Sequence, residues 1–363
     1  MKVGILTYHC AYNFGALLQC YALQEFLKSI GHESFVLNYR PQYIETKKPG
    51  INIRMLIRNP LRWGKYILTE RNKLIEFYTD FSQFENEYLN LSKTCTTKSE
   101  FEQICSQMDG VIIGSDQVWN NKYNGNDDIW FGCWKMNPYR VMSYAVSAGN
   151  PSTNLCNIDN VEDCLNKFSG ISVRENILKN VLESRIRKNI ECVLDPSLMV
   201  NPSIWEKWYK PKMNSKYIVV YQARIDSNVH RIAKIISNDI KDCEIISVDL
   251  YENSYRMCDK QVIVPPNDFV SLIRFAECVI TTSFHGTAFS IITNTPFYTI
   301  ALNDGMDERS KNLLEELGLE NRFIHKEDSP TFKPINFEKA NELLNIKRLD
   351  SQAFIIKTLE KWK

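Results

Sequence analysis

Short apolar segments rich in β-branched residues alternate with helical segments along most of the chain, and this alternation most strongly constrains its fold. Val3–Thr7 is followed by a helical apolar stripe over Gly15–Ile30, which ends at Gly31. Parallel strands need a crossover between them, usually a helix, so the pattern predicts an α/β protein with parallel sheets covered on both faces. The same pattern predicts further strands at residues 35–39, 110–113, 141–145, 170–173, 192–194, 217–221, 244–248, 261–264, 278–281 and 297–300.

The chain length and one proline-rich stretch indicate two domains. The 363 residues correspond to about two domains of ~150 residues, and Asp195–Lys216 contains three prolines among Asn and Ser residues. We expect an N-terminal α/β domain over residues 1–200 and a C-terminal one over 212–335, with doubly wound sheets facing a cleft. Residues 336–363 are predicted to be helical, and either to complete the second domain or to pack back on the first. Ligands of such sheets bind outside the carboxyl ends of the strands.

Charge and cysteine content narrow the classes of partner and site. Lys and Arg total 44 against 43 Asp and Glu, so the net charge of +1 gives no overall attraction to nucleic acid. The 11 cysteines are odd in number and lack CxxC pairs, which favours buried, reduced thiols over a disulfide framework or a zinc site. No apolar window reaches about 18 residues, and the apolar run at the N-terminus is too short for a signal peptide. We therefore expect a soluble, cytoplasmic protein that needs no metal.

One stretch departs from the α/β pattern. Lys47–Lys73 holds eight basic residues and one acid, interleaved with apolar residues, inside a predicted helical insertion at about residues 45–105. One interpretation is an insertion that packs its apolar face on the first domain and leaves its basic face in water. The other is an amphipathic surface that makes peripheral contact with the inner membrane face. Pro60 and Gly64 are expected to interrupt any single long helix here.

Polar side chains follow the predicted strands in the first half of the chain. The loop after the first strand contains Tyr8 and Asn13 and lacks the GxGxxG pattern of a dinucleotide site. Gly15 either lets the backbone approach a ligand or makes a tight strand–helix turn. Asp116 ends a buried strand, where it either caps the next helix or orients and deprotonates a hydroxyl group. We predict that Tyr8, Asn13, Gly15 and the nearby Trp119 contact an acceptor.

Arginines and a histidine follow other strands. Arg174 and Arg224 each lie at a predicted strand end, where a guanidinium group suits bidentate binding of a carboxylate or phosphate, although ion pairs are the alternative for Arg174. His285 lies between a strand and an apolar helix predicted from Thr287, beside free backbone N–H groups, and its side chain suits proton transfer near neutral pH. The absence of P-loop, HExxH and GxSxG patterns argues against a nucleotide triphosphate site, a required metal and an α/β-hydrolase.

Several segments together resemble the polysaccharide pyruvyl transferase family, in the family's order from residue 3 to about 323. They are GILTYH and NFGALLQ near the N-terminus, GSDQVW at 114–119, SVRE at 172–175, LDPS at 194–197, SFHGT at 283–287, and GMDER with LLEELGL between 305 and 319. The resemblance implies two Rossmann-like domains in an arrangement similar to GT-B glycosyltransferases. It also implies transfer of the enolpyruvyl group of phosphoenolpyruvate to two hydroxyls of a sugar, or of a lipid-linked saccharide, in a surface-polysaccharide precursor. The products would be a cyclic pyruvate ketal and phosphate, with no cofactor.

By this resemblance, Arg174 matches an arginine that binds phosphoenolpyruvate and His285 matches the catalytic histidine. We assign Asp116 as the base for the acceptor hydroxyl and Asp195 as the weaker candidate. The predicted donor site also includes Arg224, Arg309 and the turn residues, which are Ser283, Gly286 and Thr287.

The chain departs from the family at Ser283, two residues before the histidine, where characterised members often carry an arginine. Either Arg224, Arg309 or Lys311 replaces that arginine, or the donor or the transfer chemistry differs.

Two alternatives to pyruvyl transfer stay open at the level of sequence. A GT-B glycosyltransferase would use a sugar nucleotide, with an acid on the ribose for which Glu277, Asp304 and Asp307 are candidates. A non-catalytic protein would instead bind a glycan or a lipid-linked precursor.

Overall fold

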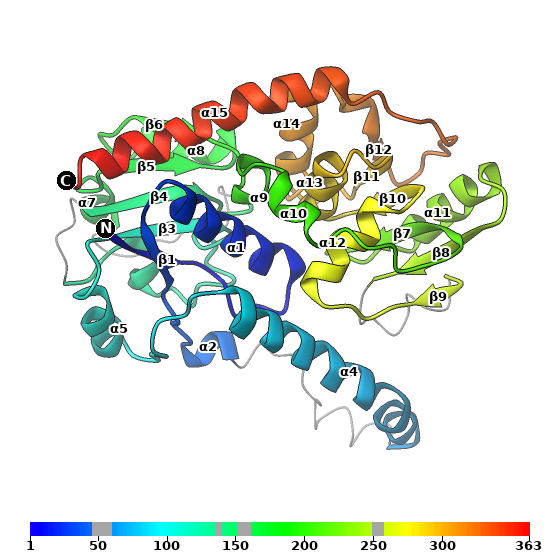
Figure 1. Cartoon of the computed structure of the whole chain (residues 1–363), viewed down its shortest axis with the longest axis horizontal. Helices are drawn as coiled ribbons and strands as arrows, with labels where there is room; N and C mark the ends of the chain where they lie inside the picture. Colours follow the sequence, from blue (N-terminus) through cyan, green and yellow to red (C-terminus); the bar gives the residue numbers. More distant parts are fainter. Residues whose placement is uncertain (46–59, 136–139, 151–160, 249–257) are drawn as a thin grey trace.

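The chain forms two parallel six-stranded sheets that stand side by side, each flanked by helices (Figure 1). The computed structural model describes residues 1–45, 60–135, 140–150, 161–248 and 258–363. The first sheet has the order β2-β1-β3-β4-β5-β6 and the second the order β12-β11-β10-β7-β8-β9. The α/β class with two parallel sheets, predicted from the alternation of segments, is therefore confirmed. We call the two halves the first and second units.

The strands are short. The central ones are almost fully buried, as expected for parallel strands covered on both faces, whereas the edge strands β6, β9 and β12 are largely half-buried or exposed. Those of the first unit are β1 (Lys2–Leu6), β2 (Glu33–Val36), β3 (Gly110–Asp116), β4 (Val141–Val146), β5 (Gly170–Val173) and β6 (Ile190–Cys192). Those of the second unit are β7 (Lys216–Tyr221), β8 (Cys243–Ser247), β9 (Lys260–Gln261), β10 (Cys278–Thr281), β11 (Phe297–Ala301) and β12 (Phe323–His325). Strand β12 was not predicted, because its three residues follow a short 3-10 turn and carry little apolar pattern.

Helices follow most strands. In the first unit they are α1 (Phe14–Ser29), α2 (Gln42–Glu45), α4 (Pro60–Tyr88), α5 (Lys98–Cys105), η1 (Asp128–Phe131), α7 (Val161–Leu165) and α8 (Asn176–Glu183). The connection and the second unit contain α9 (Pro196–Met199), α10 (Ser203–Glu206), α11 (Ser227–Asp239), α12 (Pro266–Arg274), α13 (Phe284–Ile292), α14 (Glu308–Glu316), η4 (Glu320–Arg322) and α15 (Glu338–Glu360). Local sequence sets several ends: the Asn13 side chain caps α1, and Thr97 and Glu100 form a capping box on α5.

The order of strands creates one reversal point in each sheet. In the first sheet β1 pairs with β2 on one side and β3 on the other. In the second sheet β7 lies between β8 and β10, and the order continues outward in both directions. A crevice opens where strand order reverses, at the carboxyl ends of the two central strands. The fold thus directs attention to the loops after β1, β3, β7 and β10.

An aromatic core joins the two units. Phe14, at the start of α1, stacks on Phe269 of α12 with ring centroids 4.4 Å apart, and the Tyr221 ring at the end of β7 packs edge-on against both. Helix α1 therefore belongs to the first unit by sequence and packs against the second. This contact fixes the loop before α1 relative to the end of β7.

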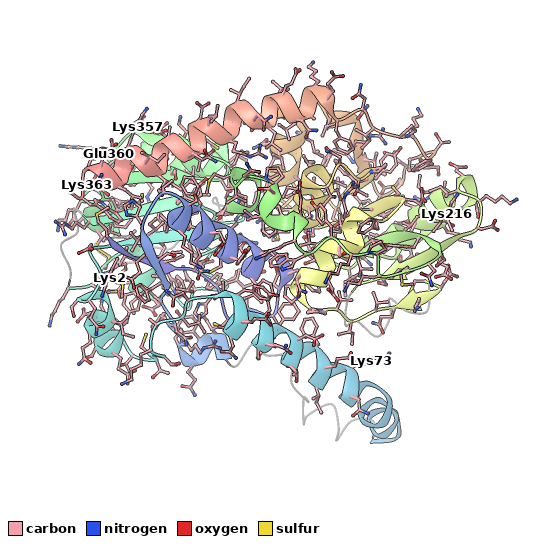
Figure 2. All side chains as sticks on the ribbon, viewed as in Figure 1. Lys2, Lys73, Lys216, Lys357, Glu360 and Lys363 are labelled. Atoms are coloured by element: carbon pink, nitrogen blue, oxygen red, sulfur yellow. A yellow bond between two sulfur atoms is a disulfide. The ribbon has the colours of Figure 1, made fainter. Side chains whose placement is uncertain are left out.

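Helix α15 runs from the second unit back across the first, as Figure 1 shows. In the second unit Lys347 forms an ion pair with Glu316 of α14. In the first unit Ser351 accepts a hydrogen bond from the Leu194 backbone N–H at 3.0 Å. The end of the helix, marked by Lys357, Glu360 and Lys363 in Figure 2, lies over the first sheet. The chain therefore ties its two units together a second time.

Trp362, just beyond α15, is expected to anchor this helix to the first unit. Its side chain is 1% exposed, its indole N–H donates to Ser169 Oγ at 2.8 Å, and its ring lies where a Cβ on Gly110 would be. Trp362→Ala should lower the free energy of unfolding by about 3–5 kcal/mol, because a buried aromatic ring leaves a cavity. Urea denaturation measures this loss. The exposed neighbour Lys363→Ala is the control, with a change within about 0.5 kcal/mol; equal effects of the two variants would contradict the anchoring role.

Helix α4 is continuous from Pro60 to Tyr88, so the expectation that Gly64 interrupts it is wrong, and Pro60 begins the helix. The helix extends beneath the second unit (Figure 1), where Lys73, labelled in Figure 2, donates to Gln261. Of the predicted basic stretch at Lys47–Lys73, residues 47–59 lie outside the described residues, and the remainder belongs to the first turns of α4. No helix in the described parts of the chain combines the length and hydropathy that crossing a bilayer requires.

The expectation of reduced, buried cysteines fails at several of the described positions, among which Cys243 and Cys258 are only half-buried. Cys133 and Cys164 form a disulfide, because α7 packs against η1 and brings their Cα atoms to 5.7 Å. Sequence spacing does not reveal a contact of this kind, since the two residues are 31 positions apart. Cys192 is a free thiol but an exposed one.

Candidate functional site

The reversal points of the two sheets face each other across a cleft of about 400 Å³. The first unit supplies the β1–α1 loop around Tyr8 and Asn13, and Asp116 at the end of β3. The second unit supplies Arg224 after β7, the β10–α13 turn, and Arg309 of α14. The cleft therefore has the position at which doubly wound sheets bind ligands.

His285 lies in the first turn of α13, on the wall of this cleft. Ser283 precedes the helix and makes no side-chain cap, so the N–H groups of the first turn lack that partner. The His285 Nε2 atom is buried, has no hydrogen-bond partner, and lies 3.6 Å from Asp195 Oδ2. The other ring nitrogen, Nδ1, lies beside Gly15 of α1. The imidazole thus points Nε2 at a carboxylate and packs its Nδ1 edge against Gly15 of α1, while the residue lines the cleft.

Gly15 is needed because the His285 ring occupies the space of a side chain. A Cβ built on Gly15 would lie 1.9 Å from His285 Nδ1 and 2.1 Å from its Cγ. The close approach anticipated at Gly15 exists, but a protein side chain makes it, not a ligand. Gly15 does not line the cleft itself. Its role is to let a residue of the second unit fit against a helix of the first.

Asp195 is the most heavily engaged carboxylate of the site. Its side chain is 0% exposed and stands at the N-cap of α9. Its Oδ1 accepts from Ser197 N–H at 2.9 Å and Ser197 Oγ at 2.6 Å, and Oδ2 lies 2.6 Å from Arg174 Nη2. Burial alone would raise the pKa of Asp195, but Arg174, His285 and Ser197 together hold it well below its usual range. Asp195 does not line the cleft and its oxygens are engaged by Ser197 and Arg174, so Asp116 stays the better-placed candidate for the acceptor base.

Arg174 and Arg309 come from different units and converge on the same place. Each has an Nη1 atom near Asp116 Oδ1, at 3.8 Å for Arg174 and 3.9 Å for Arg309. Each guanidinium also lies over the Phe284 ring, at 4.9 Å and 5.7 Å from its centroid. Arg174 Nε and Nη1 and Arg309 Nε are buried without hydrogen-bond acceptors. Two guanidinium groups therefore have unused donors beside the cleft.

The pKa of Arg309 is lowered, because burial and the Arg174 charge disfavour its cation more than Glu175 and Asp116 favour it. Glu175 is itself buried, and burial raises the pKa of its carboxyl group despite hydrogen bonds from Ser147 Oγ and the Ala148 N–H. The positive charge of Arg309 is thus only partly compensated by the carboxylates around it.

Arg224 lies at the cleft but is already committed to carboxylates. Its guanidinium pairs with Asp304 and, at 2.8 Å, with Asp307, and it donates to the Thr282 carbonyl at 2.9 Å. Asp304 and Asp307, two of the three acids considered as partners of a nucleotide ribose, are therefore already paired with Arg224. The third, Glu277, precedes β10 and so lies at the opposite edge of the sheet.

Arg174 does not line the cleft: together with Asp195, Phe284 and Arg309 it lines a smaller neighbouring pocket. Three further predicted site residues, Trp119, Gly286 and Thr287, do not line the cleft either. Trp119 is 0% exposed and donates its indole N–H to the Trp130 carbonyl at 2.7 Å, so it belongs to the core of the first unit. Gly286 packs against Thr281, and Thr287 bonds through its hydroxyl to Ser283 O and Thr299. The structure gives these three residues packing roles, because their side of α13 or of the loop faces inward.

Tyr8, Asn13 and Ser283 do line the cleft, although the Asn13 side chain is used as the helix cap. Sequence reasoning missed Tyr12, Tyr123 and Met306, which also line it. The only signal for Tyr12 was its place in the aromatic loop after β1. The described residues contain no group of three or more metal-binding side chains.

Comparison with known proteins places the chain in a family. The sequence model of polysaccharide pyruvyl transferases matches residues 13–304, so the chain belongs to the polysaccharide pyruvyl transferase family, a family of transferases. The family identified by resemblance is thereby confirmed. No curated protein sequence matches the chain significantly.

Solved structures share the fold at low sequence identity. A UDP-N-acetylglucosamine 2-epimerase from Neisseria meningitidis, bound to UDP-GlcNAc, is 9% identical with a TM-score of 0.50, over 96% of this chain and 100% of that one. A putative epimerase of the same kind from Listeria monocytogenes is 10% identical with a TM-score of 0.48, over 98% and 90%. The glycosyltransferase SnogD from Streptomyces nogalater is 10% identical with a TM-score of 0.41, over 100% and 94%. These likenesses concern the fold, which is of the GT-B kind with two Rossmann-like units.

Proposed function

We propose that the protein transfers the enolpyruvyl group of phosphoenolpyruvate to two hydroxyls of a saccharide and releases phosphate. The observation that carries this proposal is the convergence of two guanidinium groups with unused donors. Arg309 lines the cleft together with His285, and Arg174 adjoins it over the same Phe284 ring. Phosphoenolpyruvate offers a carboxylate and a phosphate, which are the groups that arginine binds best. The family match supports the same activity.

In the proposed reaction the protein supplies binding and proton transfer. His285 gives a proton to C3 of phosphoenolpyruvate, so that C3 becomes a methyl group and C2 becomes electron-poor. A sugar hydroxyl attacks C2, the C2–O bond to phosphate breaks, and a second hydroxyl closes the ketal. Of the two hydroxyl protons, one replaces the proton lost by His285 and the other leaves on phosphate. Asp116, at 16% side-chain exposure on the cleft wall, is the proposed base for the acceptor.

The structure also bears on the Ser283 departure. Of the three replacements considered, Arg224 is held by Asp304 and Asp307, and Lys311 does not line the cleft. Arg309 lines the cleft together with Ser283. We therefore assign to Arg309 the role of the arginine that characterised family members often carry at the position of Ser283. The acceptor is proposed to be a sugar, free or lipid-linked, in a surface-polysaccharide precursor at the cytoplasmic side of the membrane. Tyr8, Tyr12 and Tyr123 offer it aromatic surfaces.

Thermal unfolding with separate ligands tests the donor. Phosphoenolpyruvate should stabilise the native protein by about 2.7 kcal/mol at 100 times its dissociation constant, whereas nucleoside diphosphates and sugar nucleotides should not. Stabilisation by a sugar nucleotide alone would instead support a glycosyltransferase. Incubation with phosphoenolpyruvate and candidate saccharides, followed by phosphate release and the NMR signal of the ketal methyl group, tests the transfer.

Arg309→Gln should weaken phosphoenolpyruvate binding by about 10- to 100-fold, because a charge-assisted hydrogen bond contributes about 1.5–3 kcal/mol. Titration calorimetry measures the dissociation constant directly. Lys311→Ala removes a charge two residues away on the same helix, outside the cleft, and should leave binding within about twofold of wild type. Equal losses in both variants would mean that α14 acts only through its overall charge.

A further inference from the structure

We infer that Asp195 is a positioning residue, which fixes the orientation of both His285 and Arg174 and sets which imidazole nitrogen faces the reaction. The inference rests on the proposed function for its catalytic consequence, but the geometry stands without it. Asp195 comes from the connection between the units, Arg174 from the first unit and His285 from the second. One carboxylate thus contacts a side chain from each half of the protein.

The four acceptor directions of Asp195 are largely taken up by donors. Oδ1 receives the N–H and the hydroxyl of Ser197, while Oδ2 lies 2.6 Å from Arg174 Nη2 and 3.3 Å from Ser115 Oγ. The Arg174 Nη2 atom also donates to Ser115 Oγ at 2.6 Å, which closes the cluster. The carboxylate therefore cannot rotate without losing at least two of these contacts. Its Oδ2 is held facing His285.

His285 Nε2 completes this arrangement from the opposite side. It lies 3.6 Å from Oδ2, and a movement of roughly half an ångström would make a hydrogen bond. Burial and the lack of any other partner for Nε2 favour a proton on this nitrogen, directed at the carboxylate. With Nε2 directed at Asp195, Nδ1 is the ring nitrogen left for proton exchange with the substrate. When His285 gives up its Nδ1 proton, the remaining N–H already faces Asp195.

In Asp195→Asn, residue 195 presents a donor instead of an acceptor to His285 Nε2. An amide has one acceptor oxygen and one NH₂ group, so whichever way it is turned an N–H points at a donor. With its oxygen toward Ser197, the NH₂ group faces Arg174 and His285, and His285 must then present Nε2 as an acceptor. Asp195→Asn should therefore move the His285 proton from Nε2 to Nδ1 in the neutral ring.

The experiment is NMR of the ¹⁵N-histidine-labelled full chain, in which His285→Gln assigns the signal. We expect the neutral His285 of the wild type to carry its proton on Nε2, and Asp195→Asn to shift the population toward Nδ1. Ser197→Ala is the matched control: it disturbs the same cap but leaves Oδ2 in place, so the wild-type tautomer should persist. A wild-type His285 protonated on Nδ1, or an unchanged tautomer in Asp195→Asn, would overturn the inference. The wild-type measurement decides the question even if Asp195→Asn does not fold.

Turnover supplies the second measurement. Residues that orient a functional group typically contribute 10- to 100-fold, so Asp195→Asn should lower kcat by that factor and also raise KM for phosphoenolpyruvate through Arg174. Because the tautomer is measured without substrate, it tests the inference separately from the donor. If phosphoenolpyruvate does not bind while the tautomer behaves as expected, the proposed function fails and the positioning role holds.

Discussion

Replacing His285 with glutamine is expected to lower the rate of transfer from phosphoenolpyruvate by about 10²- to 10⁴-fold, the range for loss of a general acid. Glutamine keeps a polar group of similar reach at the start of α13 but cannot carry a transferable proton. The guanidinium groups of Arg174 and Arg309 stay in place, so the dissociation constant of phosphoenolpyruvate should change only a few-fold. Phosphate release at saturating substrate measures the rate, and calorimetry measures binding.

The control for this variant is His325→Gln, at the end of β12 on the surface of the second unit. It should leave both rate and binding at wild-type values. A drop of less than tenfold in His285→Gln would remove the histidine from the proton-transfer step. A loss of binding equal to the loss of rate would make His285 a donor-binding residue instead.

The carboxyl ends of strands were the most informative part of the sequence. Because the parallel strands of each doubly wound sheet end at one edge, residues at the ends of β3 in the first sheet, and of β7 and β10 in the second, were expected at the ligand-binding edges. Asp116, Arg224 and His285 were found in this way, and all three line the cleft. The same reasoning also selected Trp119, which is buried and does not line the cleft. The rule locates the edge of the sheet but says nothing of which side of a loop faces inward.

The contacts that hold these residues in place were beyond the reach of sequence reasoning. Asp195 follows a strand end by three residues and precedes a proline, which suits a helix cap. Its contacts with Arg174 and His285 depend on how the two units dock, and local sequence does not encode that docking. The disulfide between Cys133 and Cys164 and the fit of His285 against Gly15 depend on tertiary packing in the same way.

Gly15→Ala is expected to reduce transfer by a factor comparable to the loss of His285, about 10²- to 10⁴-fold. The new methyl group would overlap the imidazole, 1.9 Å from Nδ1, so the ring must leave its place against α1 and beside Asp195. Alanine is the better helix former by about 0.5–1 kcal/mol. The clash costs about 1–3 kcal/mol, as overpacking in a core does. The free energy of unfolding, measured with urea, should therefore fall slightly or stay level.

A double substitution separates steric contact from any other effect of alanine. In a His285→Ala background the ring is gone, so Gly15→Ala should raise the free energy of unfolding by about 0.5–1 kcal/mol through helix propensity alone. The change in sign between the two backgrounds measures the contact between Gly15 and His285, as a double-mutant cycle does for any touching pair. Stabilisation by Gly15→Ala in both backgrounds would show that His285 does not rest against α1. The cleft would then hold its histidine in another position.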